Sequence, residues 1–314
     1  MLKLLFAQRM LFIRRLQCIR QTLFVLIVLM IGGCAAAGKP APAAIPTPTI
    51  PQSLTLQPTS IPPTASLAVR TGQHSCSSTV QVEIGNGTTQ TDTINYLLYL
   101  PGDYGKDPRQ KWPLILFLHG SGERGNDLEL LKTQPLPEVL ERKVDFPFVV
   151  VSPQLPPGYE QGYTYVDYAA LAWAWSSKIE ALKVLLDQIQ STYAVDDRRV
   201  YLTGISMGGF GTWQFALRYP QYFAAIVPIA GGYIYQSEAV PENICDLKGL
   251  PVWVFHSAQD TNVSPAQDEV LVSALKACGS TVRFTLYPGI GHDAWLPAYA
   301  DPELYQWLLA QTRK

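Results

Sequence analysis

Two hydrophobic patterns alternate along the chain from about residue 113 onward. Short runs that are apolar at almost every position are separated by longer segments whose apolar side chains recur every three or four residues. The first pattern is typical of strands buried on both faces, and the second is typical of amphipathic helices. We expect buried strands at 113–118, 148–151, 200–203, 224–229, 252–255 and 282–286, and helices at 179–193, 207–218, 267–277 and 302–311.

Two further strands are expected before this alternation begins. Residues 79–84 and 93–100 have strand-like composition, and the turn-rich sequence Gly85-Asn86-Gly87 follows the first of them, so they should pair antiparallel. The later strands alternate with crossover helices, which requires a mostly parallel sheet covered by helices on both faces. The sequence therefore predicts an α/β fold, with binding and chemistry at the carboxyl ends of the strands.

The N-terminal segment has the organisation of an export signal. Its basic side chains, with no acidic residue among them, are Lys3, Arg9, Arg14, Arg15 and Arg20, and an apolar run follows at 22–31. That run is short for a membrane span but suits a signal peptide. The junction Gly32-Gly33-Cys34 resembles the lipobox of bacterial lipoproteins, which implies a signal peptide at 1–33 and lipid on Cys34. An uncleaved anchor or an ordinary secretory signal are the alternatives.

The segment 34–72 is predicted to be a tether, and 73–314 the catalytic domain. Eight prolines stand between residues 35 and 70 among Ala, Thr, Gln and Ser, a composition that cannot sustain a helix or sheet ladder. We therefore expect an extracytoplasmic protein, lipid-anchored to a bacterial membrane.

Charge argues against a nucleic-acid partner. The whole chain has 24 basic and 25 acidic residues, and without its first 33 residues it keeps 19 basic against 25 acidic ones. Nucleic-acid binders instead present clustered positive charge. No metal-ligand spacing or nucleotide fingerprint is present in the sequence, so no metal and no cofactor are expected.

A candidate nucleophile stands between a predicted strand and a predicted helix. Gly204-Ile205-Ser206-Met207-Gly208 has the Gly-x-Ser-x-Gly pattern of a nucleophile elbow, in the strand–turn–helix context that the pattern requires. A serine hydroxyl needs a base to become an effective nucleophile. Where the serine stands in a nucleophile elbow, the acid and the base follow it in the chain. His292 is the preferred base, whereas His256 is interpreted as a structural residue.

The acid that orients His292 is expected to be Asp260, in the loop after strand 252–255. Asp293 is the rival, but side chains adjacent in sequence rarely face each other. The glycine-rich sequence His119-Gly-Ser-Gly-Glu-Arg-Gly125 follows strand 113–118 and should form an anion hole, with the amides of Ser121 and Met207 as donors. His119 should shape this loop.

Together these motifs resemble the α/β-hydrolases, especially exported esterases related to dienelactone hydrolase, feruloyl esterases and the catalytic domains of prolyl-oligopeptidase-type peptidases. The resemblance covers about residue 79 to the C-terminus. It implies the α/β-hydrolase fold, here without a propeller or a large lid, and a serine hydrolase that cleaves carboxylic esters through an acyl-enzyme. A serine peptidase or amidase acting on small peptides is the alternative, and a non-catalytic surface binding protein is a third interpretation.

The substrate is expected to be a small-molecule or polysaccharide-linked ester. Aromatic residues that could contact it, with ordinary packing as the alternative, are Tyr163, Tyr165, Trp173, Trp175, Tyr233, Tyr235 and Trp295. Substrate contacts are proposed for Arg124, Trp175, Tyr233 and Trp295, although an ion pair of Glu123 with Arg124 that braces the loop is the preferred role for these charges. Cys245 and Cys278 should lie at the amino end of the sheet, either as a disulfide or as two unpaired thiols.

Overall fold

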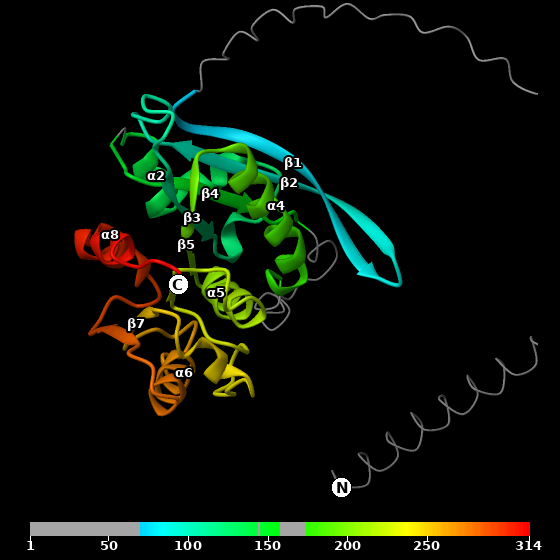
Figure 1. The fold of residues 1–314 in the computed structure, drawn as a ribbon. Coiled ribbons are helices and arrows are strands. Elements are labelled where there is room, and N and C mark those ends of the chain that lie inside the picture. Colours follow the sequence, from blue (N-terminus) through cyan, green and yellow to red (C-terminus); the bar gives the residue numbers. More distant parts are fainter. Residues whose placement is uncertain (1–69, 144, 158–173) are drawn as a thin grey trace, which may run out of the picture. The chain divides into compact units, whose positions relative to one another are not determined.

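A computed structural model describes residues 70–143, 145–157 and 174–314, and within them one sheet carries all the named strands (Figure 1). The eight strands follow the order β1-β2-β4-β3-β5-β6-β7-β8 across the sheet. Their bounds are β1 Gly72–Gly85, β2 Thr88–Leu100, β3 Trp112–Leu118, β4 Val149–Gln154, β5 Val195–Ile205, β6 Ala225–Ile229, β7 Trp253–Ser257 and β8 Arg283–Tyr287. The signal peptide, Cys34, Tyr163, Tyr165, Trp173 and the tether up to residue 69 lie outside the described residues.

The first two strands form a hairpin that is longer than the sequence indicates. β1 pairs antiparallel with β2 along nearly its whole length, and β2 pairs antiparallel with β4. Asn86 and Gly87 make the turn with positive φ angles of 51° and 72°, the left-handed conformation that these two residue types adopt most easily. β1 begins at Gly72, because its polar first half pairs with the buried end of β2.

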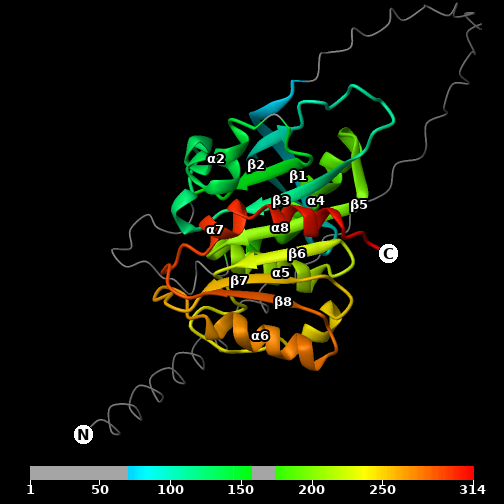
Figure 2. The same ribbon diagram turned by 90° about the vertical axis from the view of Figure 1, so that its left-hand side faces the viewer.

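The remaining pairings are parallel, as the sequence predicts. β3 lies between β4 and β5, and β6, β7 and β8 follow in chain order (Figure 2). Every residue of β3 is buried, because helices cover both faces of the sheet at this point. Side chains alternate between the faces: Leu114 and Leu116 join one core cluster, whereas Ile115 and Phe117 join the other.

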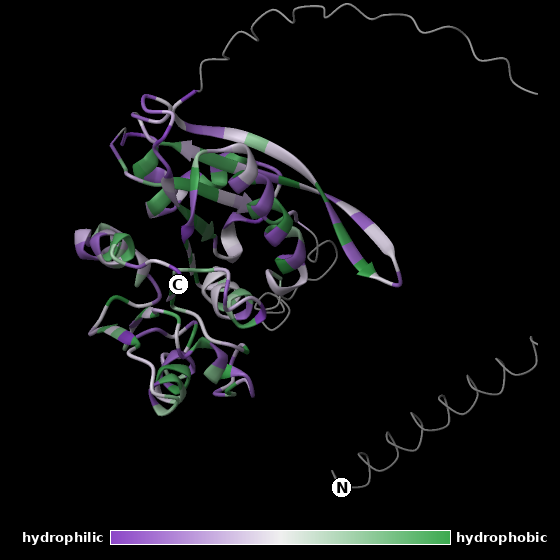
Figure 3. Ribbon diagram, in the orientation of Figure 1, coloured by the Kyte–Doolittle hydropathy of each residue, from purple (hydrophilic) through white to green (hydrophobic). Residues whose placement is uncertain are grey.

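Each face of the sheet is covered by its own set of helices. The helices α4 (Ile179–Thr192), α5 (Met207–Arg218) and α6 (Ala266–Ala277) contribute to one core cluster, and α2 (Pro135–Leu140), α7 (Trp295–Ala300) and α8 (Pro302–Leu309) contribute to the other. Hydrophobic residues fill the central strands, whereas the helices alternate between hydrophobic and hydrophilic residues (Figure 3). This is the predicted α/β architecture; α2 and α7 were not expected, since six residues are too few to show helical periodicity.

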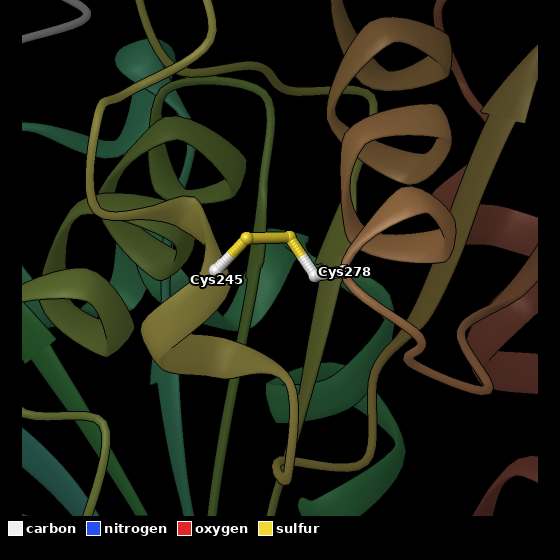
Figure 4. Close-up of a disulfide and its surroundings, with 2 residues drawn as sticks. All are labelled: Cys245 and Cys278. Atoms are coloured by element: carbon white, nitrogen blue, oxygen red, sulfur yellow. A yellow bond between two sulfur atoms is a disulfide. The ribbon is translucent and has the colours of Figure 1, made fainter.

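The structure resolves the alternatives for two cysteines. Cys245, in a short 3₁₀ helix at Ile244–Leu247, forms a disulfide with Cys278, which caps α6, and their Cα atoms are 5.5 Å apart (Figure 4). Cys76 is a free, half-buried thiol. Within the described parts of the chain, no helix is both long and apolar enough to cross a membrane.

Candidate active site

Ser206 occupies a sharp turn between β5 and α5. Its φ and ψ angles are 52° and −115°, a strained conformation for a residue with a side chain. The turn needs small neighbours, because a Cβ atom on Gly204 would lie 2.3 Å from the carbonyl oxygen of Gly208. The Ser206 amide donates a hydrogen bond of 2.9 Å to the Ile229 carbonyl at the end of β6, which fixes the turn to the sheet. This is the nucleophile elbow that the sequence predicts.

Three predicted residues meet at this turn. The Ser206 hydroxyl lies 2.9 Å from His292 Nε2, and His292 Nδ1 lies 2.6 Å from Asp260 Oδ2. They come from the loops after β5, β8 and β7, so the carboxyl ends of three strands supply one hydrogen-bonded chain. The carboxylate that pairs with His292 is that of Asp260 and not that of its sequence neighbour Asp293.

Asp260 is held as an ionised carboxylate. Its Oδ1 atom accepts hydrogen bonds of 2.9 Å from the amides of both Asn262 and Val263. Burial alone would raise its pKa, but the hydrogen bonds from His256, His292 and the Val263 amide outweigh burial and hold the pKa of Asp260 well below its usual range. The ionised carboxylate keeps the His292 proton on Nδ1, so Nε2 faces the serine as an acceptor.

The glycine-rich loop after β3 packs beside the elbow. A short 3₁₀ helix at Ser121–Glu123 carries Ser121 to the edge of a pocket of about 460 Å³ that also exposes Ser206 and Met207. Gly208 makes this approach possible, because a Cβ atom there would lie 2.0 Å from the Leu118 carbonyl oxygen. Both residues that the sequence nominates as amide donors therefore line the same pocket as the serine.

His119 supports this loop from inside. Its Nδ1–H donates to the Gly120 carbonyl at 2.5 Å, and its Nε2 accepts from the Leu155 amide at 3.0 Å. Burial lowers the pKa of His119 to about 4, so the ring is neutral at physiological pH. His119 thus connects the loop to the residue after β4 and has no contact with Ser206 or His292 among its hydrogen bonds.

Of the four residues predicted to contact the substrate, Trp295 lines the pocket and the other three do not. Trp295 lines the pocket and packs edge-on against the His292 ring, with ring centroids 4.9 Å apart. Trp175 is only 1% exposed and donates from Nε1 to the His119 carbonyl, so it supports the loop from beneath and does not line the pocket. This corrects the expected substrate contact of Trp175 in favour of ordinary packing, the alternative given for it: its ring fills the core beside α5.

Arg124 and Tyr233 are also absent from the walls of this pocket. Arg124 Nε donates to the Ser121 carbonyl at 2.9 Å, which braces the loop, and Tyr233 borders a separate depression. Glu123 accepts from Gln134 at 2.7 Å. Substrate contacts of Arg124 and Tyr233 stay predictions.

Several residues of the pocket wall were not foreseen. They are Gln134, Phe210, Thr261, Asn262 and Val263. Tyr235, named above only as one of several aromatic residues, lines it too. Phe210 is one helical turn beyond Ser206. The other unforeseen residues stand in loops or at the start of a helix, where the hydrophobic pattern does not predict which way a side chain points. Within the described ranges, no group of three His, Cys, Asp or Glu side chains is placed to hold a metal ion.

Residues 88–293 match the model of the Esterase family, described as "Putative esterase". The chain belongs to the Esterase family. It is similar to the carboxylesterase SOBER1 of Arabidopsis thaliana, with 26% identity over 189 residues that cover 57% of this chain and 82% of that enzyme. It is also similar to a poly(3-hydroxyoctanoate) depolymerase of Pseudomonas fluorescens, with 29% identity over 136 residues that cover 41% of this chain and 49% of that one.

Solved structures agree on the fold. A thermostable esterase is 31% identical, with a TM-score of 0.55, and the match covers 76% of this chain and 63% of that protein. A ferulic acid esterase from Anaeromyces mucronatus, solved with ferulic acid, is 15% identical with a TM-score of 0.56, covering 78% of this chain and 92% of that one. The expected α/β-hydrolase fold is confirmed, and family membership makes the chain an ester hydrolase.

Proposed function

We propose that this esterase cleaves carboxylic esters by nucleophilic attack of Ser206, through a covalent acyl-enzyme. The observation that carries the proposal is the continuous hydrogen-bonded chain from Asp260 through His292 to Ser206, with the serine at the wall of a pocket. A serine hydroxyl is a weak nucleophile on its own and is activated when a base accepts its proton. The intact chain disfavours a purely binding role.

Each step uses a group that is already in place. His292 Nε2 accepts the proton as the Ser206 oxygen attacks the ester carbon, and the amides of Ser121 and Met207 stabilise the resulting oxyanion. The imidazolium then gives this proton to the departing alcohol, which leaves the acyl group on Ser206. A water molecule gives a proton to His292 as it attacks the acyl carbon. The bond from that carbon to the Ser206 oxygen then breaks, the Ser206 oxygen takes the proton from His292, and the acid is released.

The pocket supports an ester with a ring or another bulky apolar group. Phe210, Tyr235 and Trp295 give it an aromatic wall, and Gln134, Thr261 and Asn262 add groups that can hydrogen-bond hydroxyls. A small-molecule or polysaccharide-linked ester of an aromatic acid fits both features. A small peptide or amide is the second candidate substrate, and family membership favours the ester.

The experiment is covalent labelling of the full-length protein with a fluorophosphonate probe, together with a substrate panel. The wild type should be labelled, and Ser206→Ala should lose both labelling and hydrolysis. Ser273→Ala is the matched control, because Ser273 is exposed on α6 and its hydroxyl donates to the Glu269 carbonyl on the same helix. Hydrolysis of aryl, feruloyl and sugar-acetyl esters without hydrolysis of peptides supports the proposal. An unlabelled wild type, or Ser206→Ala with normal turnover, overturns it.

We also propose that the protein is exported and lipid-anchored through Cys34. The support is the basic segment, the apolar run and the Gly32-Gly33-Cys34 junction, followed by the proline-rich segment. A diacylglyceryl group supplies two acyl chains, enough for stable anchoring where one chain is marginal. Mass spectrometry of the mature N-terminal peptide should find lipid on Cys34. An unmodified N-terminus beyond Cys34, or recovery of Met1, would contradict the anchor without bearing on Ser206.

A further inference from the structure

A second histidine lies directly behind Asp260. His256, at the end of β7, is fully buried, and the proposed chemistry does not use it. Its Nδ1 atom lies 2.8 Å from Asp268 Oδ2, and its Nε2 atom lies 3.0 Å from the Val263 carbonyl oxygen. Nε2 is also 3.2 Å from Asp260 Oδ2, the same oxygen that receives the hydrogen bond from His292. One carboxylate oxygen is therefore shared by two imidazole rings.

The partners of His256 determine its protonation state. Both ring nitrogens face oxygen atoms that can only accept, namely two carboxylates and a backbone carbonyl. A neutral imidazole has one nitrogen without a proton, which would set a lone pair against one of these oxygens. His256 is therefore an imidazolium. His119 is the contrasting case, since one of its nitrogens faces an acceptor and the other faces the Leu155 amide.

Asp268 stabilises the buried positive charge of His256 and fixes the orientation of its ring. It lies in the first turn of α6 and is fully buried. Its Oδ1 accepts from Trp213 Nε1 at 2.8 Å, and its Oδ2 accepts from the Gly231 amide at 3.2 Å as well as from His256. Hydrogen bonds from α5 and from the segment after β6 thus hold the Asp268 carboxylate in place, so it stays fixed if Asp260 moves.

Building on the proposed function, we propose that His256 and Asp268 are positioning residues of the catalytic chain, which then extends as Asp268–His256–Asp260–His292–Ser206. His256 and Asp268 together carry no net charge. His256 can therefore hold Asp260 in place with a charge-assisted hydrogen bond while its charge is balanced by Asp268. Asp260 keeps its negative charge to stabilise the imidazolium that forms on His292 during turnover.

Charge-specific variants of the full-length protein separate this role from simple packing. Asp260 and Asp268 are the charged side chains in contact with His256. His256→Gln removes the cation and leaves the Asp268 charge uncompensated near Asp260. Added negative charge makes it easier for the base of the catalytic chain to bind a proton. The acidic limb of the kcat/KM profile should therefore move to higher pH by about one unit or more. We expect kcat to fall about 10-fold, with little change in KM.

The double variant His256→Gln/Asp268→Asn removes the leftover charge as well. Its acidic limb should return toward the wild-type position, although it carries one more substitution beside the site than the single variant. A packing role predicts no such return. His74→Gln, the same substitution in β1 away from the site, is the matched control and should keep the wild-type profile. An acidic limb that stays in place in His256→Gln, or that does not return in the double variant, overturns the proposal.

A second measurement has a readout on the wild type alone, so the inference stays testable even if a variant fails to fold. Nitrogen-15 NMR of histidine-labelled wild-type protein reports the protonation of each ring, and it requires no activity. At pH 8 one ring should carry protons on both nitrogens, and its signal should be absent in His256→Gln. Four neutral rings at pH 8 would overturn the inference even if Ser206 proves to be the nucleophile. Conversely, retained hydrolysis in Ser206→Ala would remove the proposed function while leaving the buried imidazolium intact.

Discussion

Replacement of Gly208 by alanine tests how the elbow meets the neighbouring strand. Gly208 is the second residue of α5, where helix propensity alone favours alanine over glycine by about 1 kcal/mol. The structure predicts instead that Gly208→Ala destabilises the protein. A Cβ atom on Gly208 would lie 2.0 Å from the Leu118 carbonyl oxygen, 2.6 Å from the Leu118 carbonyl carbon and 2.8 Å from the His119 carbonyl oxygen.

The magnitude follows from what would have to move. Contacts of a Cβ atom under 3.0 Å are essentially never seen, so the elbow and the end of β3 must separate by about 1 Å. All three close atoms belong to backbone, and no side-chain rotation can relieve them. Overpacking of a core costs about 1–3 kcal/mol, and we take about 3 kcal/mol for a backbone obstacle. After subtraction of the propensity gain, the net loss is about 2 kcal/mol, or about 4–8 °C in Tm for a domain of this size.

Thermal unfolding and fluorophosphonate labelling of the full-length variants measure the two consequences. Gly208→Ala should lower Tm and slow labelling, because the loop that carries Ser121 moves away from Ser206. Gly249→Ala is the control: a Cβ atom there meets nothing within 4 Å, and we expect a change of at most about 0.5 kcal/mol. Gly208→Ala with an equal or higher Tm and normal labelling would refute the argument, since helix propensity would then outweigh the contact with β3.

Three further results are expected. The double variant Cys245→Ser/Cys278→Ser should lose about 3–4 kcal/mol in urea unfolding, from loop closure over a separation of 33 residues, and equal stability would contradict this. Asp260→Asn should lower kcat about 10⁴-fold whereas Asp293→Asn should not, so the reverse order would assign the acid to Asp293. Burial lowers the pKa of His256, but hydrogen bonds to Asp260 and Asp268 outweigh burial and raise it to about 10 from its ordinary value of 6.5. Its stabilising contribution is therefore fully present below pH 6.5 and is lost as pH rises toward 10; Tm measured across this range should fall more for the wild type than for His256→Gln, and parallel curves would refute it.

The sequence predicts those parts of the molecule that depend on local pattern. The bounds of α5, Met207–Arg218, are as predicted, because a turn with two glycines begins the helix and its apolar spacing is clear. The choice of Asp260 over Asp293 was also accessible, since Asp260 follows a predicted strand whereas Asp293 is adjacent to His292 in sequence, and adjacent side chains rarely face each other. Both predictions rest on backbone geometry that a motif specifies.

The features that the sequence does not predict depend on contacts between segments that are distant in the chain. Nothing in the spacing of Asp268 distinguishes it from a solvent-exposed acid in the first turn of a helix, and only the packing of α6 against β7 buries it against His256. The sequence left Trp175 open between substrate contact and ordinary packing, and only the space that Gly211 leaves for its ring against α5 decides for packing. Neither the missing side chain of a glycine nor the partner of a buried acid is visible in hydrophobic periodicity.

The pairing of β3 with β5 has a consequence for when activity arises during folding. These strands join Leu114 to Val200, with β4 and α4 between them along the chain, so a long loop must close before they meet. The same pairing sets Leu118 beside Gly204 and so brings the Ser121 loop to the elbow. Helices can form from local contacts much earlier. During refolding, helical circular dichroism should therefore recover before the serine becomes reactive, and probe labelling would time the closure of the centre of the sheet.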